Sequence, residues 1–172
     1  QTMLEMELNQ RGYHFTKIAV HGDTPTMIAS RQTVLEYQEI VLSNNRSALC
    51  ILIDTGSRSS GGKCWIVGTH LDAFDAEQRR SEIQIILNNT NVANVANNKE
   101  DKNIHYPIVV MGDFNQQRPQ DYTTDEWNRI MESANRRNIP IDDGVSTILE
   151  DNSFQCILDD VRRSGHGDGN NN

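Results

Sequence analysis

Two stretches of the chain end in side chains that could do chemistry. The first, Pro107–Asn115, is an apolar run typical of a strand buried on both faces, and it leads directly into Gly-Asp-Phe-Asn. Because side chains alternate along a strand, we expect Asp113 and Asn115 on one side and Phe114 on the other. Asp and Asn also begin ordinary turns, so this stretch alone leaves a turn and a functional site equally open.

The second stretch, Cys64–Asp72, is another apolar strand that ends in polar residues. A period of two places His70 and Asp72 on the same face of this strand. A single histidine at a strand end is more often structural than catalytic. Two buried strands that both deliver ionisable or amide groups at their carboxyl ends are a stronger signal, because open sheets place their ligand sites there.

Strands dominate the elements that must position these residues. A helix over Thr2–Arg11, with Gly12 after its end, precedes them. The expected strands are Tyr13–Val20, Met27–Arg31, Val34–Leu42, Leu49–Ile53, Cys64–Asp72 and Pro107–Met111. The Gly/Ser-rich loop Ser57–Lys63 predicts an antiparallel pair between the two strands that flank it.

Two longer helices are expected after the strand ends. The first follows Asp75, its predicted N-cap, with Ile83, Ile86 and Leu87 against the sheet and with Arg79 and Arg80 on the solvated face. The Asn-rich stretch Asn88–Asn103 is predicted to be the end of this helix followed by a mobile loop.

The second helix begins after Thr123, which forms a predicted capping box with Glu126. Its expected buried stripe is Trp127, Ile130, Met131 and Ala134. A short further helix is expected before the chain ends. The acidic pairs Asp142–Asp143 and Asp159–Asp160 are neighbours in sequence that would point apart, which favours solvated turns over a metal site.

Composition limits the classes of protein that remain. The 172 residues suit one domain, residues 1–163, followed by a Gly/Asn-rich tail, 164–172, that we expect to be disordered. The net charge of −8 argues against a generally basic nucleic-acid surface. No apolar run reaches transmembrane length. Cys50, Cys64 and Cys156 lack metal-type spacing, so we expect buried free thiols, which mildly favour an intracellular compartment.

The two stretches resemble a known family. GTHLD followed by a helix, and then PIVVMGDFNQ, are similar to motifs of the endonuclease/exonuclease/phosphatase superfamily, whose members include deoxyribonuclease I-like nucleases, phosphoinositide phosphatases and sphingomyelinases. Order and spacing are similar across most of Gly12–Asp160. The resemblance implies an α+β fold, a four-layered α/β sandwich of two packed, mostly antiparallel sheets flanked by helices.

The resemblance also implies a metal-dependent phosphoric ester hydrolase that uses Mg²⁺ or Mn²⁺. Asp113 would orient or deprotonate the attacking water and could contact the metal. Asn115 would bind the phosphate, and His70 would donate to a phosphoryl oxygen. Asp72 is expected to be structural, bonding a loop amide. A nucleic acid, a phospholipid headgroup or a nucleotide ester could each be the substrate, and the oligomeric state stays open.

The chain also departs from the family pattern. A Gln-Glu pair whose Glu holds the metal is expected upstream of Gln1, and a Ser-Asp-His motif is expected where this chain has a Gly/Asn-rich tail around His166. The sequence therefore predicts a piece of a longer protein, incomplete at both ends, with little activity by itself and weak Mg²⁺ binding. Its compartment is otherwise not readable.

Two alternatives remain beside the hydrolase. A non-catalytic interaction domain derived from the same fold would keep the packing and lose the site. A calcineurin-like metallophosphoesterase also places a Gly-Asp pair after a strand, but it should show a downstream Gly-Asn-His-Asp segment, which this sequence lacks.

Overall fold

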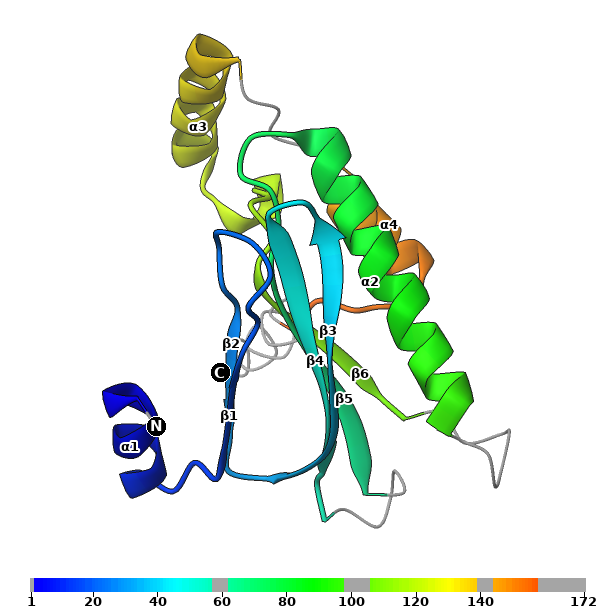
Figure 1. Ribbon diagram of the computed structural model, residues 1–172. Helices are drawn as coiled ribbons and strands as arrows, with labels where there is room; N and C mark the ends of the chain where they lie inside the picture. Colours follow the sequence, from blue (N-terminus) through cyan, green and yellow to red (C-terminus); the bar gives the residue numbers. More distant parts are fainter. Residues whose placement is uncertain (1, 57–61, 98–105, 139–143, 158–172) are drawn as a thin grey trace, which may run out of the picture.

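A computed structural model describes residues 2–56, 62–97, 106–138 and 144–157, with the side chains of 91–97 left aside. It has two sheets with helices outside them (Figure 1). The strands are β1 (Phe15–Ile18), β2 (Met27–Ser30), β3 (Thr33–Ser43), β4 (Arg46–Asp54), β5 (Lys63–His70) and β6 (Ile108–Asp113). The helices are α1 (Met3–Gln10), α2 (Ala76–Asn97), the 3₁₀ turn η1 (Pro119–Asp121), α3 (Thr124–Arg137) and α4 (Val145–Asp151).

The larger sheet has the order β3-β4-β5-β6, and the smaller one pairs β1 with β2. All pairs are antiparallel except β5 with β6, which run parallel. The α+β prediction of two packed, mostly antiparallel sheets flanked by helices is therefore confirmed. The described residues supply a helical layer, the four-stranded sheet and the two-stranded sheet of the expected sandwich.

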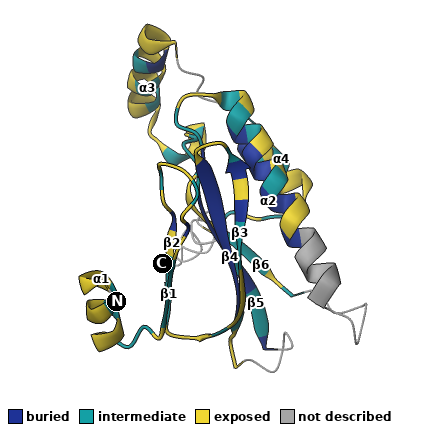
Figure 2. Cartoon of the chain, in the orientation of Figure 1, coloured by how far each residue is buried: buried dark blue, intermediate teal, exposed yellow. Residues whose placement is uncertain are grey.

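The main core lies between the four-stranded sheet and helices α2 and α4. Cys50 and Leu52 from β4 and Trp65 and Val67 from β5 pack there with Ile83 of α2. The opposite face of the sheet is covered by the β1–β2 pair, since the position of a Cβ on Gly68 would lie 3.2 Å from side-chain atoms of Ile28. Figure 2 shows β4 as the most continuously buried strand, as its apolar run predicted.

Strand β6 corrects one expectation. Its apolar run predicted burial on both faces, but Ile108, Val109 and Val110 are only half-buried and Met111 is 48% exposed. Within the described part of the chain β6 pairs with β5 alone and forms the edge of the sheet. A continuous apolar run therefore does not by itself distinguish a central strand from this one.

Helix α2 corrects a second expectation. Arg79 was predicted on the solvated face but is fully buried, and its guanidinium donates to the carbonyl of Asp72 at 2.9 Å. Arg79 lies four residues before Ile83 and therefore on the face that packs against the sheet. Arg80 is half-exposed and pairs with Glu77, as expected for a solvated position. The helix also runs on to Asn97, further into the Asn-rich stretch than its composition indicated.

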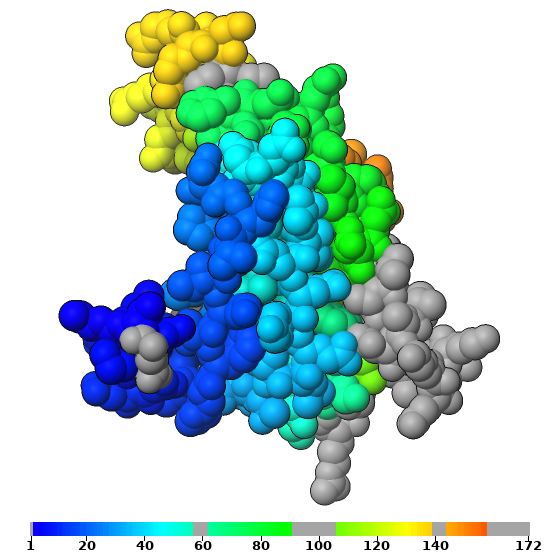
Figure 3. Space-filling model, viewed as in Figure 1, coloured from blue at the N-terminus to red at the C-terminus, as the bar shows by residue number. Residues whose placement is uncertain are grey.

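Helix α3 begins as predicted, with a capping box between Thr123 and Glu126. Its expected buried stripe is only partly buried: Ala134 is buried, Trp127 and Ile130 are half-buried, and Met131 is 37% exposed. Figure 3 shows α1 and α3 standing out from the rest of the molecule at its two ends. A helix that projects in this way has little of the described chain to pack its stripe against.

Several predictions fall outside the described residues. These are most of the loop Ser57–Lys63, the predicted mobile loop after the helix end at Asn97, the acidic pairs Asp142–Asp143 and Asp159–Asp160, and the tail 164–172. The antiparallel pairing of β4 with β5 on either side of that loop is confirmed. None of the described helices is long and apolar enough to cross a membrane.

The three cysteines are free thiols, as predicted. Cys50 is buried as expected, but Cys64 and Cys156 are only half-buried, which corrects the prediction for these two. Burial raises the pKa of the Cys50 thiol to about 12, against a smaller opposing effect of a hydrogen bond with Gln38. We expect Cys50 to resist iodoacetamide at pH 8 in the folded chain and to react once urea unfolds it. Mass spectrometry of the peptides measures this, and labelling of Cys50 as fast as Cys156 in the folded chain would contradict the burial.

Candidate functional site

His70 and Asp113 are the last residues of two neighbouring strands, so both lie at the carboxyl ends of these strands. β5 and β6 run parallel, and their register places His70 directly beside Asp113. The imidazole Nε2 lies 3.9 Å from the Asp113 carboxylate Oδ2, and the two side chains are 41% and 65% exposed. The structure therefore brings together two of the three predicted site residues, 43 positions apart in sequence, where solvent and a ligand can reach both.

The corner after Asp113 is a turn, not a continuation of the strand. β6 ends at Asp113, and the Asn115 backbone has a φ of 49°, in the left-handed region that asparagine tolerates. The Asn115 backbone N–H donates to Asp113 Oδ1 at 2.8 Å. Asp113 and Asn115 lie together as predicted. The cause is a turn closed by the Asp113 carboxylate, and not the alternation of side chains along a strand.

Asn115 is joined to β5 through the backbone of Leu71. Its side-chain Nδ2 donates to the Leu71 carbonyl at 2.8 Å, and the Leu71 N–H donates to the Asp113 carbonyl at 2.9 Å. The side-chain amide of Asn115 is thus oriented by the backbone of Leu71, the residue that follows His70. The backbone of Leu71, which directly follows His70, thus contacts both Asp113 and Asn115 and links all three predicted site residues.

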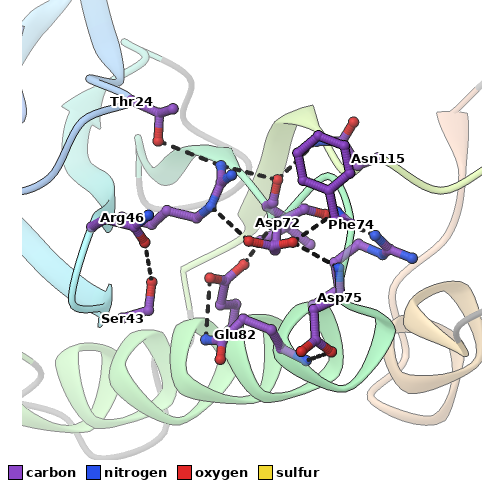
Figure 4. A network of polar contacts seen from close by, with 12 residues as sticks. Thr24, Ser43, Arg46, Asp72, Phe74, Asp75, Glu82 and Asn115 are labelled. Carbon is purple, nitrogen blue, oxygen red and sulfur yellow. Dashed lines mark hydrogen bonds and ion pairs between the residues drawn. The ribbon is translucent and has the colours of Figure 1, made fainter. Parts of the chain in front are cut away.

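Asp72 has the structural role expected of it. Its Oδ1 accepts the backbone N–H groups of Phe74 at 2.7 Å and Asp75 at 2.8 Å, which shapes the turn into α2 (Figure 4). Its Oδ2 lies 3.3 Å from the Nε of Arg46. Partial burial raises the pKa of this carboxyl, but the N–H groups of Asp75 and Phe74 and the charge of Arg46 outweigh it, and the pKa is lowered.

Two buried charged residues beside the site escaped the sequence reasoning. Arg46 is 7% exposed at the start of β4, and Glu82 of α2 is fully buried. Glu82 accepts the Asp72 backbone N–H at 2.8 Å and the Gln78 side-chain amide at 3.3 Å. Glu82 lies four residues before Ile86 and therefore on the predicted sheet-facing side of the helix, which was a usable signal. Arg46 gave none, because its partners are distant in sequence.

A metal site is not complete within the described residues. No three His, Cys, Asp or Glu side chains converge in that part of the chain. Mg²⁺ takes hard oxygen ligands in near-octahedral geometry, and Asp113 is one carboxylate next to an imidazole and an amide. The described donor set therefore does not fit a dedicated Mg²⁺ centre.

Comparison with known proteins gives a fold. No family model matches the chain, and no curated protein matches it in sequence. Two crystal structures of ANGEL2, a 2′,3′-cyclic phosphatase, are similar, with TM-scores of 0.54 and 0.51 at 16% and 15% identity. Both similarities cover 69% of this chain but only 36% and 37% of those chains. The human Nocturnin catalytic domain is less similar, with a TM-score of 0.47 at 18% identity over 66% of this chain and 46% of that one.

Proposed function

Because the chain has the fold of the endonuclease/exonuclease/phosphatase superfamily, we propose that it carries the His-Asp-Asn part of a phosphoric ester hydrolase site. One observation supports this more than any other: His70 and Asp113 lie side by side at the carboxyl ends of parallel strands, with Asn115 tied to both strands. Open sheets bind their ligands at this position. The chain spans little more than a third of the ANGEL2 structures.

In the proposed reaction each residue has a separate task. Asn115 and His70 donate hydrogen bonds to the phosphoryl oxygens, where negative charge accumulates in the transition state. Asp113 orients the attacking water and takes its proton as the new P–O bond forms and the bond to the leaving alkoxide breaks. The exposed carboxylate of Asp113 already accepts one backbone N–H, which fixes its direction.

We further propose that Mg²⁺ or Mn²⁺ assists this hydrolysis and that the 172-residue chain binds it weakly. A divalent ion would stabilise charge on the phosphoryl oxygens when bound. Asp113 is the residue of the described site that could contact it. A single carboxylate holds Mg²⁺ poorly, so the chain by itself should turn over phosphate esters slowly or not at all.

The substrate class stays open among phosphate esters, including nucleic acids, phospholipid headgroups and nucleotides. The ANGEL2 structure with adenosine-2′,3′-vanadate makes 2′,3′-cyclic nucleotides a reasonable member of a test panel. Bis(4-nitrophenyl) phosphate and 4-nitrophenyl phosphate would represent diesters and monoesters. With Mg²⁺ present we expect little or no turnover of any of them, and robust Mg²⁺-dependent turnover that Asp113→Ala abolishes would contradict this expectation.

Phosphate binding tests the site independently of turnover. We expect inorganic phosphate to shift the NMR signals of the His70 ring and the Asn115 side-chain amide saturably, because these groups are the proposed phosphate donors. Asn115→Ala should weaken this binding at least about fivefold, the loss of one hydrogen bond to a charged group. His14→Gln, which changes an exposed histidine of the loop before β1, is the control and should bind phosphate like the unmodified chain.

One observation favours the second candidate, a non-catalytic interaction domain. The described residues lack a complete metal site, which an interaction domain would not need. If inorganic phosphate shifts the NMR signals of the His14 and His70 rings equally, or shifts neither, the hydrolase proposal is overturned and this alternative is supported.

A further inference from the structure

The buried guanidinium of Arg46 needs an explanation beyond its ion pair. A buried charge is costly unless its donors find partners, and one carboxylate can satisfy only part of an arginine. Besides its Nε contact with Asp72, Arg46 uses Nη1 to donate to the carbonyls of His70 and Leu71, both at 3.2 Å, and to Thr24 Oγ1 at 3.4 Å. Figure 4 shows Arg46 between Thr24 and Asp72.

The two carbonyls that Arg46 binds belong to the part of β5 that carries the site. The first is the carbonyl of His70 itself. The second, on Leu71, also accepts the Asn115 side-chain amide, while the Leu71 N–H is bound to the Asp113 carbonyl. The Leu71 peptide is thus held by Arg46 from one side and by the Asp113–Asn115 corner from the other.

We propose that Arg46 is a positioning residue for the phosphate-binding groups, and that it acts through the Leu71 peptide on His70 and Asn115. It fixes the direction of the His70 and Leu71 carbonyls, and the Leu71 carbonyl fixes the Asn115 amide. A lysine would keep the charge beside Asp72, but its ammonium is a compact charge without the planar array of donors that spans both carbonyls and the carboxylate. The expected effect on phosphate binding rests on the proposed function. The orientation of His70 and Asn115 by Arg46 does not depend on it.

The test compares Arg46→Lys with Arg79→Lys in the full chain. Arg79 is the matched control, since it is the other buried arginine among the described residues and donates to the carbonyl of Asp72, one residue beyond Leu71. Without ligand, the Asn115 side-chain amide and His70 ring signals should move in Arg46→Lys and stay near their original positions in Arg79→Lys. With inorganic phosphate, Arg46→Lys should bind at least about fivefold more weakly, and Arg79→Lys within about twofold of the unmodified chain.

The outcomes separate the two proposals. Ligand-free signals that move only in Arg46→Lys support the positioning role even if phosphate fails to bind, in which case only the proposed function fails. Unchanged Asn115 signals in a folded Arg46→Lys variant, or equal changes in both variants, overturn the positioning role. If Arg46→Lys does not fold, the unmodified chain decides, because Nη1 protons held by two carbonyls should exchange slowly with solvent, and fast exchange would overturn the proposal.

Discussion

Replacing Gly112 by alanine should lower the free energy of unfolding by about 3–5 kcal/mol or prevent folding, from backbone strain and overpacking together. Gly112 has a φ of 141°, which side chains other than hydrogen rarely allow. A Cβ there would lie 1.8 Å from the Thr69 carbonyl oxygen and 2.9 Å from the Thr69 carbonyl carbon. Thr69 is buried in β5, one residue before His70, so neither strand can move away without separating the site. Urea unfolding followed by circular dichroism measures the loss.

Gly12→Ala is the matched control for this variant. Gly12 also has a positive φ, 84°, but a Cβ there would meet nothing within 4 Å. It should therefore cost only the backbone strain of a left-handed alanine, about 1 kcal/mol. Equal losses in the two variants would show that contact with Thr69 does not matter and that β5 and β6 are less closely packed at the corner than the structure has them.

The two strand ends at the site illustrate what the sequence could predict. The apolar runs before His70 and Asp113 and the Gly-Asp-Phe-Asn corner were enough to identify two strand ends with chemical groups. That the two ends lie side by side follows from the parallel pairing of β5 with β6, across 43 residues of intervening chain. Period two assigns a face to each side chain but not a neighbour to each strand, so the sequence left this adjacency open and the structure supplies it.

Buried charges explain most of what sequence reasoning missed. Charged residues are mostly exposed, so Arg79 was assigned to solvent, and Arg46 and Glu82 received no role. Each has partners among the backbone groups around Leu71 and Asp72, at the turn between β5 and α2. Such partners leave no pattern in the sequence, since any residue supplies a carbonyl or an N–H. Only the helical spacing of Arg79 and Glu82 from Ile83 and Ile86 indicated their burial. Asp72 could be predicted because its own partners are local turn amides.

Asp72→Asn should lower the free energy of unfolding by about 2 kcal/mol at pH 7, because it leaves the buried guanidinium of Arg46 without a charged partner. The loss should depend on pH. Burial raises the pKa of the Asp72 carboxyl, but the Asp75 and Phe74 N–H groups and Arg46 together lower it below its ordinary value of 3.8. A lowered pKa in the folded state stabilises the fold above the pKa of the unfolded state, and the contribution disappears as the pH falls through the folded value.

The difference in the free energy of unfolding between Asp72→Asn and the unmodified chain should therefore be largest at pH 5–7. It should shrink below about pH 4, as Asp72 becomes protonated and resembles the amide. Urea midpoints of both chains measured from pH 7 to pH 2.5 would show this. Glu77→Gln removes an exposed ion pair with Arg80 and should change stability by less than about 0.5 kcal/mol at every pH. A gap for Asp72→Asn that stays constant down to pH 2.5 would mean that the Asp72 contribution comes from hydrogen-bond geometry that asparagine cannot reproduce, and not from its charge.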